Sequence, residues 1–556
     1  MTKAYNLLEE PLINTTPCGA LTLPGVLAAL ARDTVEGFPA LRPHQMPAWH
    51  MFLVQLAALA LQGAGRDDIP EDEKEWRRLL RGLTEDFPQD EPWFLTVEDW
   101  SKPAFLQPPV PVGMELGKIP VPTPDALDLL ITSKNHDMKQ AIVYKGTPED
   151  WLFSLISHQT GGTFSVQYSS TIRKGNSFAP RICIGFVSLP SNKSKNYSFH
   201  YGLRFKRDVY ILIKTREEEF EYYEDLYRES DGIKLTWIES WVQGESLQLN
   251  QLDPWFIEVC RRIRLLVNKG KIIARCKSDK TKKINDLGLN GNIGDPWTPE
   301  SRIDEYRAFS LSENGFNYSV LCKLFFGEFN KSGVYVHNWK IPVLARVHSG
   351  DLTGDTLLLV AQGVAGERTK TGTLGYYSKV MPISGRVAQS LGPRRKELHQ
   401  LAQQQIKAIA DFERALSSAL ALVLANGDHE KARGKNGNIK PALHDRLIEP
   451  RAHLDRFADE IFFPHLWRRF EAGEAGDAGR EREEWQTFVR RLWKRTDDIF
   501  WQFLPAMPCA ALYRYRAEAR AESALRAMVR KNHPELFQNT TQNIALKTEG
   551  EGEHAA

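Results

Sequence analysis

The histidines, cysteines and carboxylates of this 556-residue sequence are the side chains that could hold a metal or activate water. Two histidines precede an aspartate directly, in the pairs His136–Asp137 and His444–Asp445. Neither pair lies in a cluster of His, Asn and Asp of the kind that binds a nuclease metal ion. The sequence also lacks a GxxxxGK[ST] phosphate loop, a GxSxG nucleophile motif, an HExxH motif and a GxGxxG motif. We therefore predict no catalytic residues, no metal site and no cofactor.

The six cysteines fit neither a zinc site nor a disulfide framework. They lie far apart, at positions 18, 183, 260, 276, 322 and 509, without a CxxC pair or zinc-ligand spacing to histidine. Reduced thiols are the expectation for so large a chain. No run approaches the roughly 18–20 apolar residues that a membrane span requires. We therefore expect a cytoplasmic protein that does not bind membranes.

Basic residues gather between Phe256 and Ile284, where ten Lys or Arg residues stand against two acidic residues. Apolar residues alternate with them in a strand–turn–strand pattern around Asn268–Gly270. A hairpin tip carrying Lys269 and Lys271 would bring two ammonium groups to phosphates or to the acceptor edges of bases. The same pattern also fits a solvated hairpin face.

Three further segments combine cations, amides or hydroxyls with turn residues. Each fits an ordinary surface turn as well as contacts with phosphates or the minor groove. The net charge of +2 does not oppose DNA binding, because a local basic stripe is enough to release counterions. The segments are Asp128–Lys139 with Lys134, Asn135, His136 and Lys139, Gln159–Arg181 with Arg173, Lys174, Gly175 and Asn176, and Glu367–Lys379. Together with the hairpin, they favour contact with nucleic acid.

The hydrophobic patterns predict an α+β fold that begins with a large mixed domain over residues 1–385. Pro47–Gly63 is apolar nearly all round, as in a helix buried in a core. Strand-like runs cover Arg181–Val187, Val209–Ile213 and Thr356–Ala361. We therefore expect short sheets and helices in this part of the chain.

Residues 386–535 carry four helical patterns, which predict an all-α four-helix bundle. The patterns lie at Leu391–Leu424, His444–Glu471, Glu481–Phe503 and Cys509–Lys531, with a loop at Asn426–Asn438. Residues 536–556 are polar and are expected to form a disordered tail.

Several short motifs follow one another in a characteristic order. They are YNLLEEPLI near the start, PAFLQPP at Pro103–Pro109, DLLITSKNHDMK at Asp128–Lys139, HQTGG at His158–Gly162, RFKRDVYILI around Arg207–Asp208, FIEVCRRIRL from Phe256, GDPWTP at Gly294–Pro299 and GYYSKVMPI at Gly375–Ile383. In this order, and with the helical C-terminal region, the sequence resembles the large, CasA-type subunit of the type I-E CRISPR Cascade surveillance complex. The resemblance spans about the first 535 residues.

The resemblance implies a non-catalytic subunit that recognises the protospacer-adjacent motif in double-stranded DNA, largely through the minor groove. Such a subunit helps to open the duplex for R-loop formation and helps to recruit a separate helicase-nuclease. The implied partners are the target duplex, the 5′ end region of the guide RNA, the other Cascade subunits and the helicase-nuclease. Because guide pairing supplies sequence specificity, the protein need only read a short motif and the duplex shape.

The resemblance also assigns the family's DNA-contacting loops to positions in this chain. The first loop falls on Lys134–Lys139, the glycine loop near Arg173–Asn176, the lysine finger near Lys269 or Lys271, and the glutamine wedge near Lys370 and Thr371. Two features depart from the family. The glycine loop has the single glycine Gly175, and the wedge loop has no glutamine, so that Lys370 or Thr371 would act there.

Two other functions fit parts of the pattern. A metal-dependent nuclease would cut DNA as the isolated chain, and a stand-alone regulator would bind one sequence tightly without guide RNA. The sequence has no recognisable helix-turn-helix signal, which counts against the regulator. The C-terminal helices also carry basic residues that suit either DNA or a solvated helix face. These are Arg490, Arg491, Lys494, Arg514 and Arg520.

Overall fold

A computed structural model describes the chain over residues 5–128, 146–161, 171–174, 180–190, 200–277, 281–303, 307–330, 332–353, 356–366, 373–434 and 436–537. The chain forms two compact units. The first comprises Met1–Phe316 and Phe329–Gln389, and the second comprises Asn317–Glu328 and Ser390–Ala556. We expected a boundary after residue 385; the units divide after Gln389, and the second unit also includes an earlier helix.

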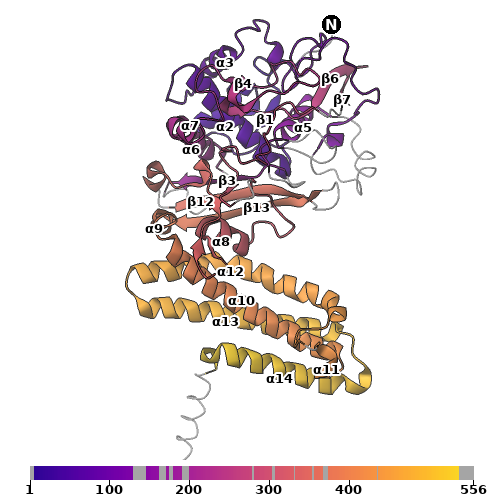
Figure 1. Cartoon of the computed structure of the whole chain (residues 1–556), viewed down its shortest axis with the longest axis vertical. Helices are drawn as coiled ribbons and strands as arrows, with labels where there is room; N and C mark the ends of the chain where they lie inside the picture. The colour runs from indigo at the N-terminus through magenta and orange to yellow at the C-terminus, as the bar shows by residue number, and fades with distance from the viewer. Residues whose placement is uncertain are drawn as a thin grey trace, which may run out of the picture. The chain divides into compact units, whose positions relative to one another are not determined.

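The first unit mixes helices with short strands (Figure 1). Its helices are α1 (Leu23–Ala31), α2 (Met46–Gly63), α3 (Glu73–Gly82), α5 (Pro148–Thr160), α6 (Tyr201–Lys214) and α7 (Arg216–Tyr222), and α9 (Gly385–Ser390) ends at the boundary. Its strands are β1 (Ile13–Thr15), β2 (Gly19–Leu21), β3 (Cys183–Leu189), β4 (Ile233–Leu235), β5 (Leu252–Ile257), β6 (Arg262–Asn268), β7 (Lys271–Lys277), β8 (Glu300–Ser301), β10 (Tyr335–Val336), β11 (Trp339–Lys340), β12 (Thr356–Gly366) and β13 (Thr373–Ser384). The short strand β9 (Glu328–Phe329) lies at the boundary between the units.

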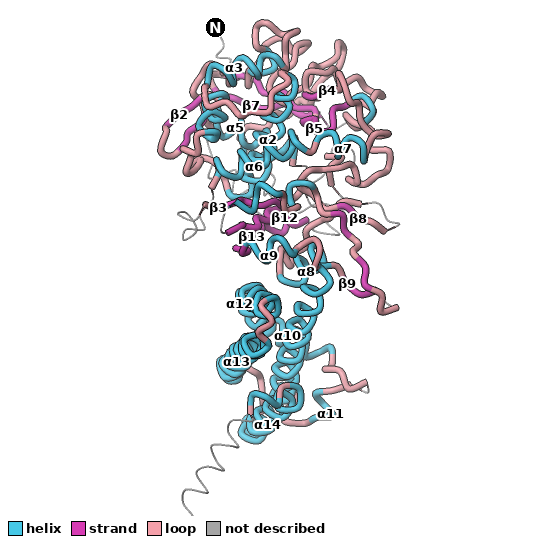
Figure 2. The backbone as a smooth tube through the Cα atoms, turned by 90° about the vertical axis from the view of Figure 1, so that its left-hand side faces the viewer, coloured by secondary structure: helices cyan, strands magenta, loops and turns pink. Residues whose placement is uncertain are grey.

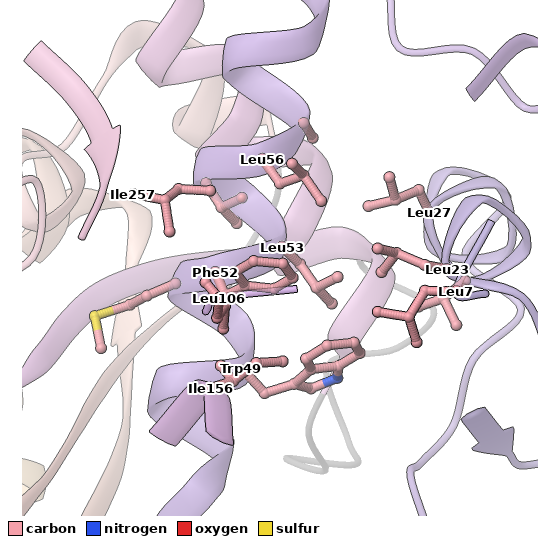
Figure 3. Packing of buried hydrophobic residues seen from close by; sticks show 14 of the residues in the cluster. Leu7, Leu23, Leu27, Trp49, Phe52, Leu53, Leu56, Leu106, Ile156 and Ile257 are labelled. Carbon is pink, nitrogen blue, oxygen red and sulfur yellow. The ribbon is translucent and has the colours of Figure 1, made fainter. Parts of the chain in front are cut away.

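Helix α2 is buried in the core of the first unit, as its apolar sequence predicts. Figure 3 shows Trp49, Phe52, Leu53 and Leu56 of this helix among buried residues of other segments, including Ile156 of α5. Burying a side chain of this size contributes about 1.5–3 kcal/mol. The helix therefore fixes the elements that pack around it.

The largest sheet has three antiparallel strands in the order β13–β12–β3. Gln362 of β12 pairs with Cys183, the first residue of β3, and Gly366 pairs with Thr373 of β13. The C-terminal end of β12, which leads towards residue 367, therefore lies near the N-terminal end of β3. Arg181 lies two residues before β3, on the same side of the sheet's end.

The predicted strand at Val209–Ile213 is wrong, because these residues belong to α6. The alternation of β-branched residues suggested a strand, but the buried positions of α6 follow helical spacing, at Phe205, Asp208, Val209 and Leu212. Asp208 is buried and accepts a hydrogen bond from Nε2 of His50 at 2.8 Å. A buried carboxylate in the middle of α6 requires a hydrogen-bonding partner. This partner comes from another helix, so local sequence does not reveal it.

The described part of the second unit consists mainly of four long packed helices, with two shorter ones (Figure 2). They are α8 (Tyr318–Phe326), α10 (Arg395–Leu424), α11 (His429–Ala432), α12 (Ile448–Glu474), α13 (Ala478–Phe503) and α14 (Arg514–Asn532). The four long helices match the four predicted patterns, and the α+β fold class is confirmed. The expected loop Asn426–Asn438 contains the short helix α11, which Asp428 caps by accepting from the N–H groups of Glu430 and Lys431. Among the described helices, none has both the length and the apolar character needed to span a membrane.

Candidate nucleic-acid interface

Helix α5 is held firmly at both ends. At its start, Thr147 Oγ1 accepts from the Asp150 N–H at 3.1 Å, and the Asp150 carboxylate accepts from the Thr147 N–H at 2.8 Å. This capping box satisfies two backbone donors and fixes where the helix begins. Nearly all of its later residues are buried, and its C-terminal cap is Gly161. The last turn of α5 is therefore a rigid part of the first unit.

The side chain of Gln159 in that last turn is completely buried and uses its full hydrogen-bonding capacity. Its Nε2 donates to the carbonyls of Leu106 at 2.9 Å and Arg261 at 3.0 Å. Its Oε1 accepts from the N–H groups of Cys260 at 3.1 Å and Arg261 at 2.8 Å. One amide thus joins α5 to the chain that leads into strand β6.

The described parts of the predicted segment Gln159–Arg181 are tied to the end of α5 and to Glu258. The Arg181 N–H donates to the Gly161 carbonyl at 2.7 Å. The Glu258 carboxylate accepts from the Ile172 N–H at 2.7 Å and from the Thr171 hydroxyl. We call Gln159, Gly161, Arg181, Glu258 and Arg261 the α5 junction. It ties together stretches of chain around residues 106, 160, 172, 181 and 260.

A buried carboxylate also joins two of the arginines in this region. The Arg181 Nε donates to Asp295 Oδ2 at 2.5 Å, and Arg173 Nη1 lies 3.6 Å from the same oxygen. All three side chains are at most 1% exposed. Arg173 also donates to the Phe256 carbonyl at 2.9 Å and covers the Phe256 ring at 4.1 Å. We call Arg173, Arg181 and Asp295 the arginine bracket.

The predicted DNA contact Arg173 is therefore placed inside the protein, where its charge is neutralised by Asp295. This geometry does not favour direct contact with DNA. Lys174, the next residue, is partly exposed. Burial lowers the pKa of its ammonium to about 8, and the nearby charges of Arg261 and Lys282 act in the same direction. Lys174 therefore keeps most of its charge at neutral pH and is sensitive to its surroundings.

The predicted hairpin is present as strands β6 and β7, with Asn268 paired to Lys271. Its two-residue turn is Lys269–Gly270, with φ values of +49° and +75°. Positive φ at both central residues is typical of a type I′ turn, which favours Asn and Gly. The left-handed backbone conformation at position 269 costs more free energy with Lys than it would with Asn. Both Lys269 and Lys271 are exposed. The turn therefore presents two lysines to solvent at some cost in conformational energy.

The base of this hairpin is fixed by buried polar contacts. Gln107 Oε1 accepts from the Leu265 N–H at 2.6 Å, and the fully buried Arg264 donates to the carbonyls of Lys102 and Gln107 at 3.0 and 3.2 Å. Burial lowers the pKa of Arg264 to about 10. On the β7 side, Val121 and Ala274 exchange two backbone hydrogen bonds at 2.7 and 2.9 Å. The hairpin is thus a rigid projection with a cationic tip.

The first testable prediction concerns Glu258. Burial raises the pKa of its carboxyl from 4.5 to about 7, although the Thr171 hydroxyl and the charge of Arg173 oppose the shift. A raised folded-state pKa contributes stability that is fully present below pH 4.5 and is lost as the pH rises through 7. Between about pH 5 and 8, the wild type should lose about 2 kcal/mol relative to Glu258→Gln. Unfolding curves of both proteins across that range test this, with exposed Glu245→Gln as a control that should follow the wild type. Parallel curves for wild type and Glu258→Gln would contradict it.

Eight of the twelve predicted site residues lie outside the described residues. They are Lys134, Asn135, His136, Lys139, Gly175, Asn176, Lys370 and Thr371. The described residue before the first group is Asp128, whose buried carboxylate accepts from Gln45 Nε2 at 2.9 Å and from Arg42 at 3.0 Å. Gly366 precedes the last group, at the end of β12 that lies beside the start of β3. For all twelve residues, DNA contact stays a prediction.

The hairpin tip and Lys174 do not form one compact cluster. Seven residues of β6, at about 3.3 Å each, place the tip on the order of 20 Å from the α5 junction. That length corresponds to about six base pairs of B-DNA.

The basic residues of the C-terminal helices differ in their surroundings. Arg514 donates to the carbonyls of Leu504 and Met507 at 2.6 and 2.7 Å, and Arg520 donates to the Gly427 carbonyl at 2.7 Å. These contacts link helix ends and loops within the second unit. Arg490, Arg491 and Lys494 are exposed on α13.

Sequence reasoning missed the buried polar residues Gln159, Glu258 and Asp295. The only available signal was a polar side chain within an apolar segment, as with Gln159 at the end of α5. Over the described ranges, the structure contains no group of three or more His, Cys, Asp or Glu residues that could hold a metal ion.

In sequence, neither a protein-family model nor a curated protein matches the chain. Solved structures do match it along nearly its whole length. The structure of Cse1 from Thermobifida fusca has a TM-score of 0.60 at 12% identity, covering 96% of this chain and 98% of that one. CasA (Cse1) from Thermus thermophilus has a TM-score of 0.55 at 14% identity, covering 95% and 99%. A chain of a solved CRISPR RNA-guided surveillance complex has a TM-score of 0.50 at 13% identity, covering 94% and 99%.

These neighbours confirm the resemblance to CasA-type subunits at the level of the fold. The coverage shows that both units of this chain have counterparts in those proteins. At 12–14% identity the similarity extends to the fold alone.

Proposed function

We propose that this chain is the large subunit of a CRISPR RNA-guided surveillance complex and recognises the protospacer-adjacent motif in duplex DNA. Its fold matches CasA (Cse1) proteins and a chain of such a complex over nearly the whole length. The observation that carries the proposal is the α5 junction. It anchors a hairpin with an exposed cationic tip and both ends of the predicted DNA-contacting segment Gln159–Arg181.

In the proposed mechanism, the hairpin lysines bind the phosphates beside the target and position the duplex along β6 and β7. Lys174 then lies near the same stretch of duplex, and the loops around residues 135, 175 and 370 read the groove and start strand separation. Guide RNA pairing supplies the rest of the sequence specificity. The partners are the target duplex, the 5′ end region of the guide RNA, the other subunits and a helicase-nuclease that performs cleavage. The chain itself supplies no catalytic group.

The second prediction tests this function with a surveillance complex that is assembled with and without the chain. The complete complex should bind a guide-matched duplex with a favourable flanking motif at least about tenfold more tightly than one with an unfavourable motif. The preference should disappear when the chain is omitted, and single-stranded target should bind in both cases. Gel-shift titrations measure these affinities. DNA cleavage by the isolated chain with Mg²⁺ or Mn²⁺, or tight sequence-specific binding without guide RNA, would contradict the proposal.

A further inference from the structure

Two members of the arginine bracket flank Lys174 in the sequence, and Lys174 is a predicted DNA-binding residue that the structure describes. Arg173 precedes it directly, and Arg181 lies beyond residues 175–179. Both guanidinium groups point to the same oxygen, Oδ2 of Asp295. The other oxygen, Oδ1, accepts from the N–H groups of Trp297 at 2.9 Å and Thr298 at 3.2 Å. The carboxylate is thus fixed to its own loop while it neutralises two arginines.

Asp295 is the carboxylate that both arginines contact, and the buried Glu258 is a further acidic group whose charge interacts with them. Over the described part of the chain, Nε and Nη1 of Arg173 and Nη2 of Arg181 are buried without a hydrogen-bond partner. Ionic interaction with Asp295 therefore compensates for incomplete hydrogen bonding. Removing one partner of a buried ion pair leaves an uncompensated charge and is strongly unfavourable. Without the carboxylate, the buried guanidinium of Arg173 loses the charge that neutralises it, so we expect its position and that of the adjoining Lys174 to change.

A second contact places the Asp295 segment against Lys174. Gly291 lies four residues before Asp295 and has φ = +85°. A Cβ atom at Gly291 would lie 2.6 Å from both the carbonyl carbon and the carbonyl oxygen of Lys174. Only a residue without a side chain permits this approach. The backbone of Lys174 is therefore seated directly on the segment that contains Asp295.

From these contacts we infer that Asp295 is a positioning residue for duplex recognition, which acts through Arg173 to hold Lys174 beside the DNA. The inference rests on the proposed function and adds to it a residue that does not touch DNA. Asp295 sets where Lys174 lies relative to the α5 junction. Because Arg173 also donates to the Phe256 carbonyl, Asp295 also sets where Lys174 lies relative to the chain that continues into the hairpin.

The third prediction uses Asp295→Asn, Lys174→Met and the double variant in the assembled complex. Each single variant should lower affinity for guide-matched duplex by about tenfold, the equivalent of one lost charge contact. The double variant should also lose about tenfold, because residues that act through one another are non-additive. Affinity for single-stranded target should not change. Gel-shift titrations of all four complexes with duplex and single strand measure these effects.

Asp351→Asn provides a matched control. Asp351 is also buried, binds Arg207 through both oxygens at 2.6 and 2.8 Å, and accepts from the His348 N–H at 2.8 Å. It contacts Ser188, near the opposite end of β3 from Arg181. Its replacement should lower stability by a similar amount but leave duplex affinity unchanged.

Three results would overturn the inference. They are a loss of about 100-fold in the double variant, an equal loss in Asp351→Asn, or an equal loss of single-stranded binding. If Asp295→Asn does not assemble, Gly291→Ala tests the same idea, because it displaces the Lys174 backbone without changing any charge. Normal duplex affinity of assembled Gly291→Ala would then overturn it. If the wild-type complex shows no preference for any flanking motif, the proposed function itself fails; if only the variants lack an effect, the role of Asp295 fails.

Discussion

Replacing Lys269 by Asn and Lys271 by Gln should weaken duplex binding by roughly 30- to 100-fold at about 0.15 M salt, because two phosphate contacts are lost. The slope of log affinity against log salt should fall in magnitude by about two, since each contact contributes about 0.9. Asn suits the left-handed conformation of residue 269 better than Lys does. The variant should therefore unfold at the same temperature as the wild type or a higher one, so lost binding cannot be attributed to lost structure.

The control for this experiment removes two positive charges from another exposed surface of the same unit. Lys74→Gln with Arg78→Gln does this on α3, where both side chains are exposed. The control complex should keep the wild-type affinity and salt slope. A hairpin variant with an unchanged salt slope would show that the tip does not contact phosphates.

Replacing Gln159 by Leu should lower the unfolding free energy of the first unit by roughly 4 kcal/mol or more, because four buried backbone groups lose their partner. Leu fills a similar volume, so the loss reports on hydrogen bonding more than on packing. Denaturant unfolding followed by tryptophan fluorescence measures the change. Hydrogen exchange should also accelerate at the Cys260 and Arg261 amides, which donate to Gln159.

Gln405→Leu on α10 is the matched control. Gln405 is equally buried, but its Nε2 donates one hydrogen bond, to the Phe462 carbonyl at 2.9 Å, and its Oε1 has no partner among the described residues. Its replacement should cost about 1 kcal/mol. Equal losses of unfolding free energy in the two variants would show that the four hydrogen bonds of Gln159 do not stabilise the first unit more than the single bond of Gln405 stabilises the second.

Structural features that are determined by residues close together in the sequence could be predicted. The apolar run at Pro47–Gly63, the strand–turn–strand pattern around Asn268 and the four C-terminal helices all appear where their periodicity indicated. The signal is a continuous apolar run for Pro47–Gly63 and a periodic pattern of apolar and polar side chains for the hairpin and the C-terminal helices, and packing agrees with it. The same reasoning failed at Val209–Ile213, which belong to helix α6 and not to a strand. The preceding residue, Asp208, bonds to His50 of α2, and local sequence does not reveal this contact.

The inner part of the candidate site could not be predicted, because its contacts join residues far apart in the chain. Gln159 binds groups 53 and 102 residues away, and Asp295 binds Arg181 at a separation of 114 residues. No periodicity encodes such pairs. Sequence reasoning therefore identified the cationic residues and the loops, but it did not separate Arg173, which is buried and neutralised, from Lys174, which is partly exposed.

The amide of Gln159 makes all four of its hydrogen bonds to main-chain groups. Every amino acid carries a carbonyl, and every one except proline carries an N–H. The hydrogen bonds at positions 106, 260 and 261 therefore do not depend on which side chains stand there, whereas they do depend on the amide at position 159. A scaffold held in this way retains its shape while most of its residues are exchanged, which is one route by which proteins that share only about one residue in seven keep a common architecture.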